Sequence, residues 1–168
     1  MNRSIALTGF MGAGKTATAE VLCARLGCRC FSTDDEIIRR EGRPITEIFR
    51  ERGEAYFRQM ERDIVREITA GEPCVIDCGG GLVMDEQNRS VLRECALVIY
   101  LKTSPDQVFQ RVKDSTHRPL LNVADPYAEI CRLIELRSPV YEQADIIVNT
   151  DGKSPDAVAD EILKSIPF

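Results

Sequence analysis

Residues 4–16 read SIALTGFMGAGKT, and this stretch decides the fold. Its first part, Ser4–Thr8, is a short apolar run that predicts a buried strand. Gly9–Thr16 match the pattern GxxxxGK followed by Ser or Thr, and Lys15–Leu26 then predict a helix. The glycines let successive backbone N–H groups turn toward phosphate oxygens, and the helix N-terminus adds a partial positive charge. The segment therefore predicts a phosphate-binding loop between a strand and a helix.

The side chains of this loop predict a nucleoside triphosphate with its magnesium ion. Lys15 is expected to reach the β- and γ-phosphates as a point charge, and Thr16 to ligate Mg²⁺ through its hydroxyl. The alternative, a glycine turn that happens to precede Lys-Thr, does not explain the strand before it and the helix after it. We therefore expect ATP to be bound by Gly12, Ala13, Gly14, Lys15, Thr16 and Ala17.

Downstream of the loop, short apolar runs alternate with longer amphipathic stretches. This alternation predicts a parallel sheet with helices on both faces, an α/β fold of three layers (α/β/α) with a five-stranded parallel sheet. Further strands are expected at 30–32, 74–77, 97–101 and 146–148. Helices are expected at 33–41, 45–52, 54–70, 86–94, 104–112, 126–141 and 155–165.

The 168 residues suit one domain, because no linker or repeat divides them. Residues 33–70 carry helices without a strand, so we interpret them as a helical insertion on the sheet. The polar stretch 113–125 reads as a loop beside the site. The core is then made of 1–32, 71–112 and 126–168.

Composition and charge narrow the class of protein. The net charge of −5 argues against a nucleic-acid binder, which usually carries a basic surface. The seven cysteines form no pair of CxxC motifs, so we interpret them as reduced thiols rather than as disulfides or a zinc site. No apolar stretch is long enough to span a membrane, and we expect no signal peptide before the first strand. We expect a cytoplasmic monomer that binds neither nucleic acid nor membrane.

Further segments, taken with the loop, carry a resemblance along nearly the whole chain. They are Asp34, GEAYFRQME at 53–61, three glycines at 79–81, RPLL at 118–121 and ELRSPVYEQAD at 135–145. In this order and spacing the chain resembles the shikimate kinases, a family similar to the nucleoside monophosphate kinases. The resemblance implies a P-loop kinase fold with a substrate-binding insertion and a lid loop. It also implies transfer of the γ-phosphate of ATP to the 3-hydroxyl of shikimate, in the chorismate route to aromatic amino acids, with Mg²⁺ as cofactor.

The acceptor side of this reaction is expected to depend on a carboxylate and two arginines. Asp34 follows a strand at the carboxyl edge of the sheet, where it can orient an acceptor hydroxyl or take its proton. The resemblance places Asp34 on the reacting hydroxyl; an N-cap for the helix at 34–41 is the alternative, and both roles are compatible. It places Arg58 and Arg137 on the carboxylate of shikimate, which guanidinium groups bind through paired hydrogen bonds. Glu61, one helical turn from Arg58, can orient that guanidinium.

Glycines and further basic residues complete the expected site. The resemblance sets Gly80 and Gly81 against the substrate, and the entropy that successive glycines lose on folding makes a plain turn a poor explanation. It makes Arg118 a lid arginine that stabilises the transferring phosphoryl group. Arg111 and Lys153 match positions that flank adenine. The expected catalytic residues are Lys15, Asp34 and Arg118.

One position departs from the family pattern. The family usually carries an Asp-x-Asp pair after the second strand, with the first carboxylate in the outer shell of Mg²⁺, and this chain has Ser32 there. Asp77 ends the third strand where the family commonly has Ser or Thr, and a carboxylate after an apolar strand is typical of magnesium sites. We hypothesise an exchange in which Asp77 supplies the lost charge and Ser32 holds a water. Asp35 is a second candidate for that charge.

Two other functions stay open at this point. One is a kinase of another small metabolite, such as a gluconate-like sugar acid or a nucleoside monophosphate. Arg58, Arg137 and the glycines at 79–81 suit a small hydroxy acid better than a nucleotide. The other is a catalytically silent nucleotide-binding domain, which the loss of a carboxylate at Ser32 favours and the retained Lys15 opposes.

Overall fold

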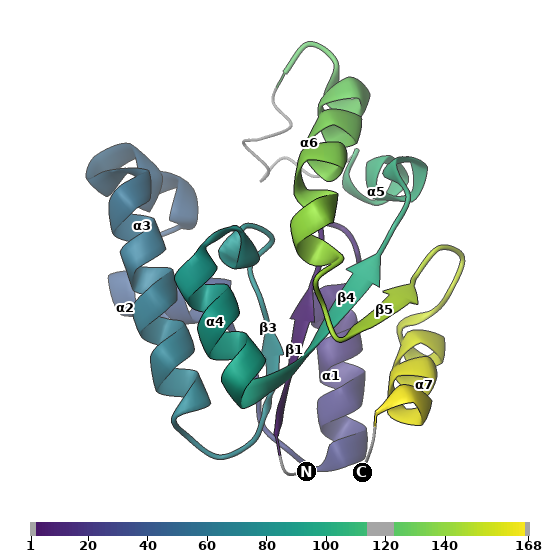
Figure 1. Cartoon of the computed structure of the whole chain (residues 1–168). Coiled ribbons are helices and arrows are strands. Elements are labelled where there is room, and N and C mark those ends of the chain that lie inside the picture. Colours follow the sequence, from purple (N-terminus) through teal and green to yellow (C-terminus); the bar gives the residue numbers. More distant parts are fainter. Residues whose placement is uncertain (1–2, 114–122, 167–168) are drawn as a thin grey trace.

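The structure, a computed structural model, describes residues 3–113 and 123–166. Five strands form one sheet in the order β2-β3-β1-β4-β5, and every neighbouring pair is parallel (Figure 1). The predicted five-stranded parallel sheet is therefore confirmed. The strands are β1 Ser4–Thr8, β2 Cys30–Ser32, β3 Val75–Asp77, β4 Ala96–Lys102 and β5 Ile146–Asn149.

Helices lie on both faces of the sheet and complete the predicted three layers (Figure 1). None of the helices described in 3–113 and 123–166 is both long and apolar enough to cross a bilayer. The helices are α1 Lys15–Leu26, α2 Thr33–Glu41, α3 Ile45–Thr69, α4 Glu86–Cys95, α5 Pro105–Val112, α6 Pro126–Tyr141 and α7 Pro155–Ser165, with a short 3₁₀ helix, η1, at Leu82–Met84.

The central strands are buried from both sides, which explains their continuous apolar runs. Side chains alternate across a strand. In β1, Ile5 and Leu7 pack into the core formed with α1 and α7, whereas Ala6 packs into the core formed with α3, α4 and α6. Since neither face of β1 meets solvent, no alternation of polar residues is needed.

Gly53 divides α3 into two parts, as the separate helices predicted at 45–52 and 54–70 require. Its φ of 80° and ψ of 170° are non-helical, and a positive φ is available to glycine without a Cβ clash. The second part of the helix buries Phe57 and Glu61 against the rest of the protein. The 3₁₀ helix η1 was not predicted, because its three apolar residues follow glycines and show no periodicity.

Candidate active site

Strands β1, β2 and β3 end at one edge of the sheet. β1 leads into the phosphate loop, and Ser32 at the end of β2 pairs in register with Asp77 at the end of β3. A cleft of about 490 Å³ opens at this edge, where parallel α/β sheets hold their ligands. The predicted site residues that line it are Gly12, Gly14, Lys15, Thr16, Ala17, Ser32, Asp34, Asp77, Gly80 and Arg111.

The phosphate loop has the backbone that its glycines predict. Gly12 and Gly14 adopt φ values of 75° and 90°, which residues with a Cβ rarely reach. Gly14 is the N-cap of α1, and no side chain caps the N–H groups of that first turn, so they can receive an anion. Lys15 donates from Nζ to the carbonyls of Gly9 at 3.0 Å and Phe10 at 3.1 Å, on the inner side of the loop.

Thr16 and Asp77 meet inside the cleft. The Thr16 hydroxyl donates to Asp77 Oδ2 at 2.6 Å. Asp77 is 7% exposed, and burial raises the pKa of its carboxyl, while the Thr16 hydrogen bond and the Lys15 charge act in the opposite direction. A hydroxyl and a carboxylate oxygen are thus held together beside the phosphate loop.

Ser32, rather than Asp34, caps the next helix. The Ser32 Oγ accepts a hydrogen bond from the Asp35 N–H at 3.2 Å, in the extended backbone conformation expected of an N-cap. The alternative interpretation of Asp34 as the cap is therefore wrong. The short side chain of Ser32 reaches the N–H of Asp35. Asp34 lies in the first turn of α2 and lines the cleft instead.

Asp34 is packed against the segment that follows β3. A Cβ added to Gly79 would overlap Asp34 Oδ1 and lie 3.2 Å from its Cγ. Burial raises the pKa of Asp34, opposed by the charge of Lys15 and increased further by that of Asp77. Gly79 was not among the predicted site residues, although its position directly after Asp77 and Cys78 could have indicated that it lies at the site. Its backbone is not left-handed, so the need for glycine here is one of space.

Arg58 lies at the other end of the same glycine segment, Gly79–Gly81. A Cβ on Gly81 would lie 3.0 Å from the Arg58 Nη1. Arg58 donates to Glu61 Oε2 at 2.7 Å and to Glu54 Oε1 at 3.1 Å. Glu61 is 1% exposed, and burial raises its pKa to about 7 against the opposing hydrogen bond and charge of Arg58. Glu61 therefore orients this guanidinium, as the i, i+3 spacing predicted.

Arg137 lies on α6 and faces the phosphate loop. Its guanidinium carbon lies 5.7 Å from the centre of the Phe10 ring in the phosphate loop. Four residues later, the Tyr141 hydroxyl donates to the Gly80 carbonyl at 2.5 Å. Arg58 thus borders the glycine segment directly, and Arg137 lies over the phosphate loop one helical turn from the tyrosine that binds Gly80; neither arginine lines the 490 Å³ cleft itself.

A second pocket, of about 240 Å³, adjoins the phosphate loop near α7. It is lined by Ala13, Arg111 and Lys153, so it contains the residues predicted to flank adenine. Arg111 donates to the Gly12 carbonyl at 2.9 Å and borders both pockets. Lys153 pairs with Glu161 at 2.5 Å. A purine in this pocket would join a phosphate chain in the first.

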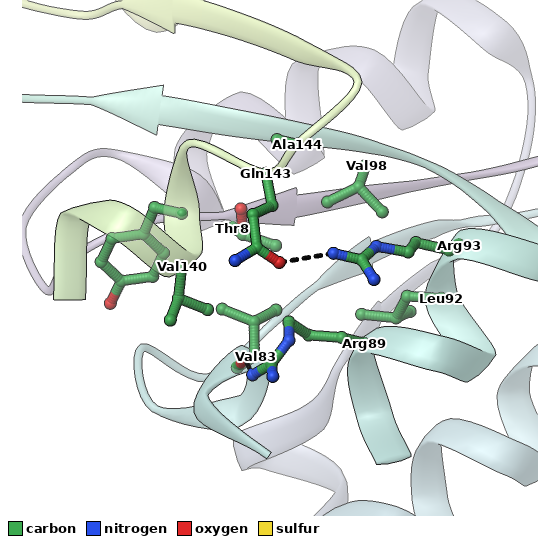
Figure 2. A pocket seen from close by; sticks show the side chains of 10 residues that line it. Thr8, Val83, Arg89, Leu92, Arg93, Val98, Val140, Gln143 and Ala144 are labelled. Carbon is green, nitrogen blue, oxygen red and sulfur yellow. Dashed lines mark hydrogen bonds between the residues drawn. The ribbon is translucent and has the colours of Figure 1, made fainter. Parts of the chain in front are cut away.

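Another cavity in the fold is too small for a metabolite. Figure 2 shows it between α4, β4 and the end of α6, with Val83, Leu92 and Val98 on its walls. Its volume is about 20 Å³, which admits about one water molecule. An Arg93–Gln143 hydrogen bond of 2.5 Å runs beside it (Figure 2). The candidate active site therefore stays with the cleft at the strand ends.

Comparisons with known proteins agree with this geometry. A family model described as shikimate kinase matches residues 11–167. The chain belongs to the shikimate kinase family. A shikimate kinase of Dehalococcoides mccartyi is 44% identical over 164 residues, 97% of this chain and 93% of that protein. A shikimate kinase of Persephonella marina is 42% identical over 164 residues, 98% of this chain and 99% of that protein. The structure of a shikimate kinase from Acinetobacter baumannii in complex with shikimate has a TM-score of 0.92 at 34% identity and covers 96% of this chain and 91% of that one.

Membership of the shikimate kinase family confirms the predicted fold class and activity. The chain is an ATP-dependent phosphotransferase of the shikimate pathway, and ATP is its co-substrate. The similarities favour this activity over a nucleotide-binding domain without catalysis. Arg118 lies outside the described residues, as does most of the predicted lid at 113–125. The hydrogen bond from Tyr141 to Gly80 was not predicted, although the position of Tyr141 four residues after Arg137 could have indicated it.

Proposed function

We propose that the cleft transfers the γ-phosphate of ATP to the 3-hydroxyl of shikimate, with Asp34 at the reacting centre. The observation that carries this assignment is the position of one partly buried carboxylate. Burial raises the pKa of Asp34, and the positive charges of both Lys15 and Arg58 oppose this rise. Lys15 belongs to the phosphate loop and Arg58 to the helical insertion at 33–70. A group that acts on donor and acceptor together must lie between two such elements.

On the donor side, the N-terminus of α1 and the loop N–H groups bind the phosphates of ATP. Lys15 leaves the Gly9 and Phe10 carbonyls, to which it now donates, and meets the β- and γ-phosphates. Arg111 and Lys153 flank the adenine in the adjoining pocket. Support for this division is that Gly14 and Arg111 line both pockets.

A magnesium ion fits beside Thr16 and Asp77. Mg²⁺ prefers oxygen ligands, keeps several waters and commonly uses few protein groups together with substrate phosphates. The Thr16 hydroxyl would bind the ion and Asp77 would accept hydrogen bonds from its waters. Ser32, in register with Asp77, keeps its O–H free to donate to a water because its oxygen only accepts in the helix cap. When bound, the ion would neutralise charge on the β- and γ-phosphates.

On the acceptor side, Asp34 aligns the 3-hydroxyl and accepts its proton as the oxygen attacks the γ-phosphorus. The new O–P bond forms while the bond to the β–γ bridging oxygen breaks, and ADP leaves with that electron pair. The raised pKa of Asp34 makes it a stronger proton acceptor than an exposed aspartate. Lys15 meets the developing charge, and the same role for Arg118, in the lid at 113–125, stays a prediction.

Specificity for shikimate comes from its carboxylate. Arg58, held by Glu61, lies against the glycine segment from α3, and Arg137 lies over Phe10 from α6. Arginine suits this task because its planar group makes paired hydrogen bonds to a carboxylate. Gly81 leaves room for the Arg58 guanidinium and Gly80 for the phosphate loop, and the substrate ring would lie against this backbone.

The experiment that tests this assignment is an ADP-release assay with shikimate, gluconate and CMP as acceptors. We expect turnover with shikimate alone. Asp34→Asn should lower kcat by roughly 10²–10⁴-fold with little change in the KM for ATP. Asp63→Asn, the same change on the exposed side of α3, is the matched control. Wild-type kcat in Asp34→Asn, or equal turnover of gluconate or CMP, would contradict the proposed site.

We further propose that the protein works as a cytoplasmic monomer that binds neither nucleic acid nor membrane. The net charge of −5 argues against a nucleic-acid partner, and the seven cysteines are free thiols, as expected in the reducing cytoplasm. Light scattering across a concentration series tests the monomer: a mass that rises to twice that of the chain would contradict it.

A further inference from the structure

The carbonyls of the glycine segment Gly79–Gly81 are held in two different ways. The Gly79 carbonyl accepts from the Leu82 N–H and the Gly81 carbonyl from the Met84 N–H, each at 3.0 Å. Both bonds belong to the local turn of η1. The middle carbonyl, of Gly80, is held from a distant element, because it accepts from the Tyr141 hydroxyl at 2.5 Å across 61 residues of sequence. The position of Gly80 therefore depends on the end of α6.

Tyr141 is built into the protein as a hydrogen-bond donor. The residue is 2% exposed, and its ring stacks on Tyr100 of β4 with a centroid distance of 5.1 Å and an angle of 19°. Burial raises the pKa of Tyr141 to about 12, against the charge of Arg137. The hydroxyl is therefore protonated at neutral pH and has a proton to give to Gly80.

Arg137 lies close to the same hydroxyl. It stands one helical turn before Tyr141 on α6, and its positive charge acts on the phenolic group, where it opposes the rise in pKa. Arginine has only donors, so a guanidinium beside this hydroxyl faces the phenolic oxygen, while the hydroxyl proton goes to Gly80.

We propose that Tyr141 is a positioning residue that holds the Arg137 guanidinium and the Gly80 backbone in one arrangement for the shikimate carboxylate. The inference rests on the proposed function, which places that carboxylate at Arg58 and Arg137. Tyr141 touches neither substrate. It fixes the middle of a segment whose two ends abut Asp34 and Arg58, so it sets the shape of the acceptor side.

The expected effect of losing the hydroxyl is confined to the acceptor. Tyr141→Phe keeps the ring and its stacking on Tyr100, and removes only the hydroxyl that donates to Gly80. The KM and the dissociation constant for shikimate should rise roughly ten-fold, because the buried Gly80 carbonyl is left unpaired and the Arg137 guanidinium loses the hydroxyl beside it. The KM for ATP should stay near that of the wild type, since Gly80, Tyr100 and Arg137, with which Tyr141 interacts, have no assigned contact with ATP.

The experiment measures shikimate binding by calorimetry and both KM values for Tyr141→Phe, with Tyr100→Phe as the matched control. Tyr100 is the buried partner in the same stack and loses the same atom. The methyl ester of shikimate provides a second readout. If Tyr141 acts through Arg137, its loss should weaken binding of the acid several-fold more than binding of the uncharged ester.

Each outcome decides the matter. A shikimate KM unchanged in Tyr141→Phe but raised in Arg137→Ala overturns the inference and leaves the proposed function in place. An unchanged value in both variants overturns the proposed carboxylate site as well. Equal losses for acid and ester, equal rises in the KM for shikimate and ATP, or a lowered melting temperature without a change in KM would each show that Tyr141 only stabilises the fold.

Discussion

Replacing Gly79 by alanine tests whether the position of Asp34 limits turnover. The added methyl group would overlap Asp34 Oδ1 and lie 3.2 Å from its Cγ. Nonbonded heavy atoms settle at about 3.5–4.0 Å, so the carboxylate must move by roughly 1 Å. A displacement of that size in a catalytic group lowers the rate by about 10²-fold. We therefore expect Gly79→Ala to lower kcat for shikimate about 10²-fold, with the KM for ATP nearly unchanged.

The assay is steady-state ADP release, and two further variants make it decisive. Gly71→Ala is the control, because Gly71 is exposed, has no positive φ and would place its Cβ no closer than 3.4 Å to the Ile68 carbonyl. In an Asp34→Asn background, Gly79→Ala should add little further loss, since both changes act on one carboxylate. A wild-type kcat in Gly79→Ala, or full additivity of the two losses, would refute this reasoning.

The remaining predictions concern the metal, the anion site and pH. Asp77→Asn should raise the Mg²⁺ concentration for half-maximal turnover roughly ten-fold. An unchanged Mg²⁺ titration would contradict the hypothesis that Asp77 supplies the charge missing at Ser32. Lys15→Ala should abolish turnover, and any retained kcat would contradict its role at the phosphates. Arg58→Ala should raise the KM for shikimate and leave the KM for ATP unchanged, as measured in separate titrations of the two substrates. The pKa of Glu61 rises from 4.5 to about 7 on folding, so the native state binds this proton more tightly than the unfolded chain. As the pH rises from 4.5 to 7, the free energy of unfolding of the wild type should therefore fall by up to about 3 kcal/mol. Glu61→Gln should lack this loss in urea melts at pH 5 and pH 8, and parallel pH dependences would contradict it.

The elements that local sequence controls were predictable. The phosphate loop has its own glycine pattern, and Gly53 marked the kink in α3 because only glycine takes its positive φ without strain. Buried strands such as β1 read as continuous apolar runs because both faces are covered. In the loop and at Gly53 the conformation depends on the residues themselves and on their neighbours in sequence, and in β1 the burial by distant helices is visible in the apolar residues of the strand itself.

Features that depend on packing between distant segments were not predictable. Asp34 was expected at the site but was also considered as the cap of α2, and only the fold shows that Ser32 provides this cap. Gly79 matters because of space beside Asp34, 45 positions earlier in the chain, and Tyr141 because its hydroxyl reaches Gly80. A single sequence does not show such contacts between distant segments. The residue types at the ends of predicted strands nevertheless indicate where in the fold the site residues lie.

The central claim is that Asp34, Arg58 and Arg137 serve one bound acceptor. A crystal structure with ADP, Mg²⁺ and shikimate tests it most directly. We predict the shikimate carboxylate within hydrogen-bonding distance of both guanidinium groups and the 3-hydroxyl within about 3 Å of the Asp34 carboxylate. Shikimate bound with its carboxylate away from either arginine, or with its 3-hydroxyl away from Asp34, would contradict the account.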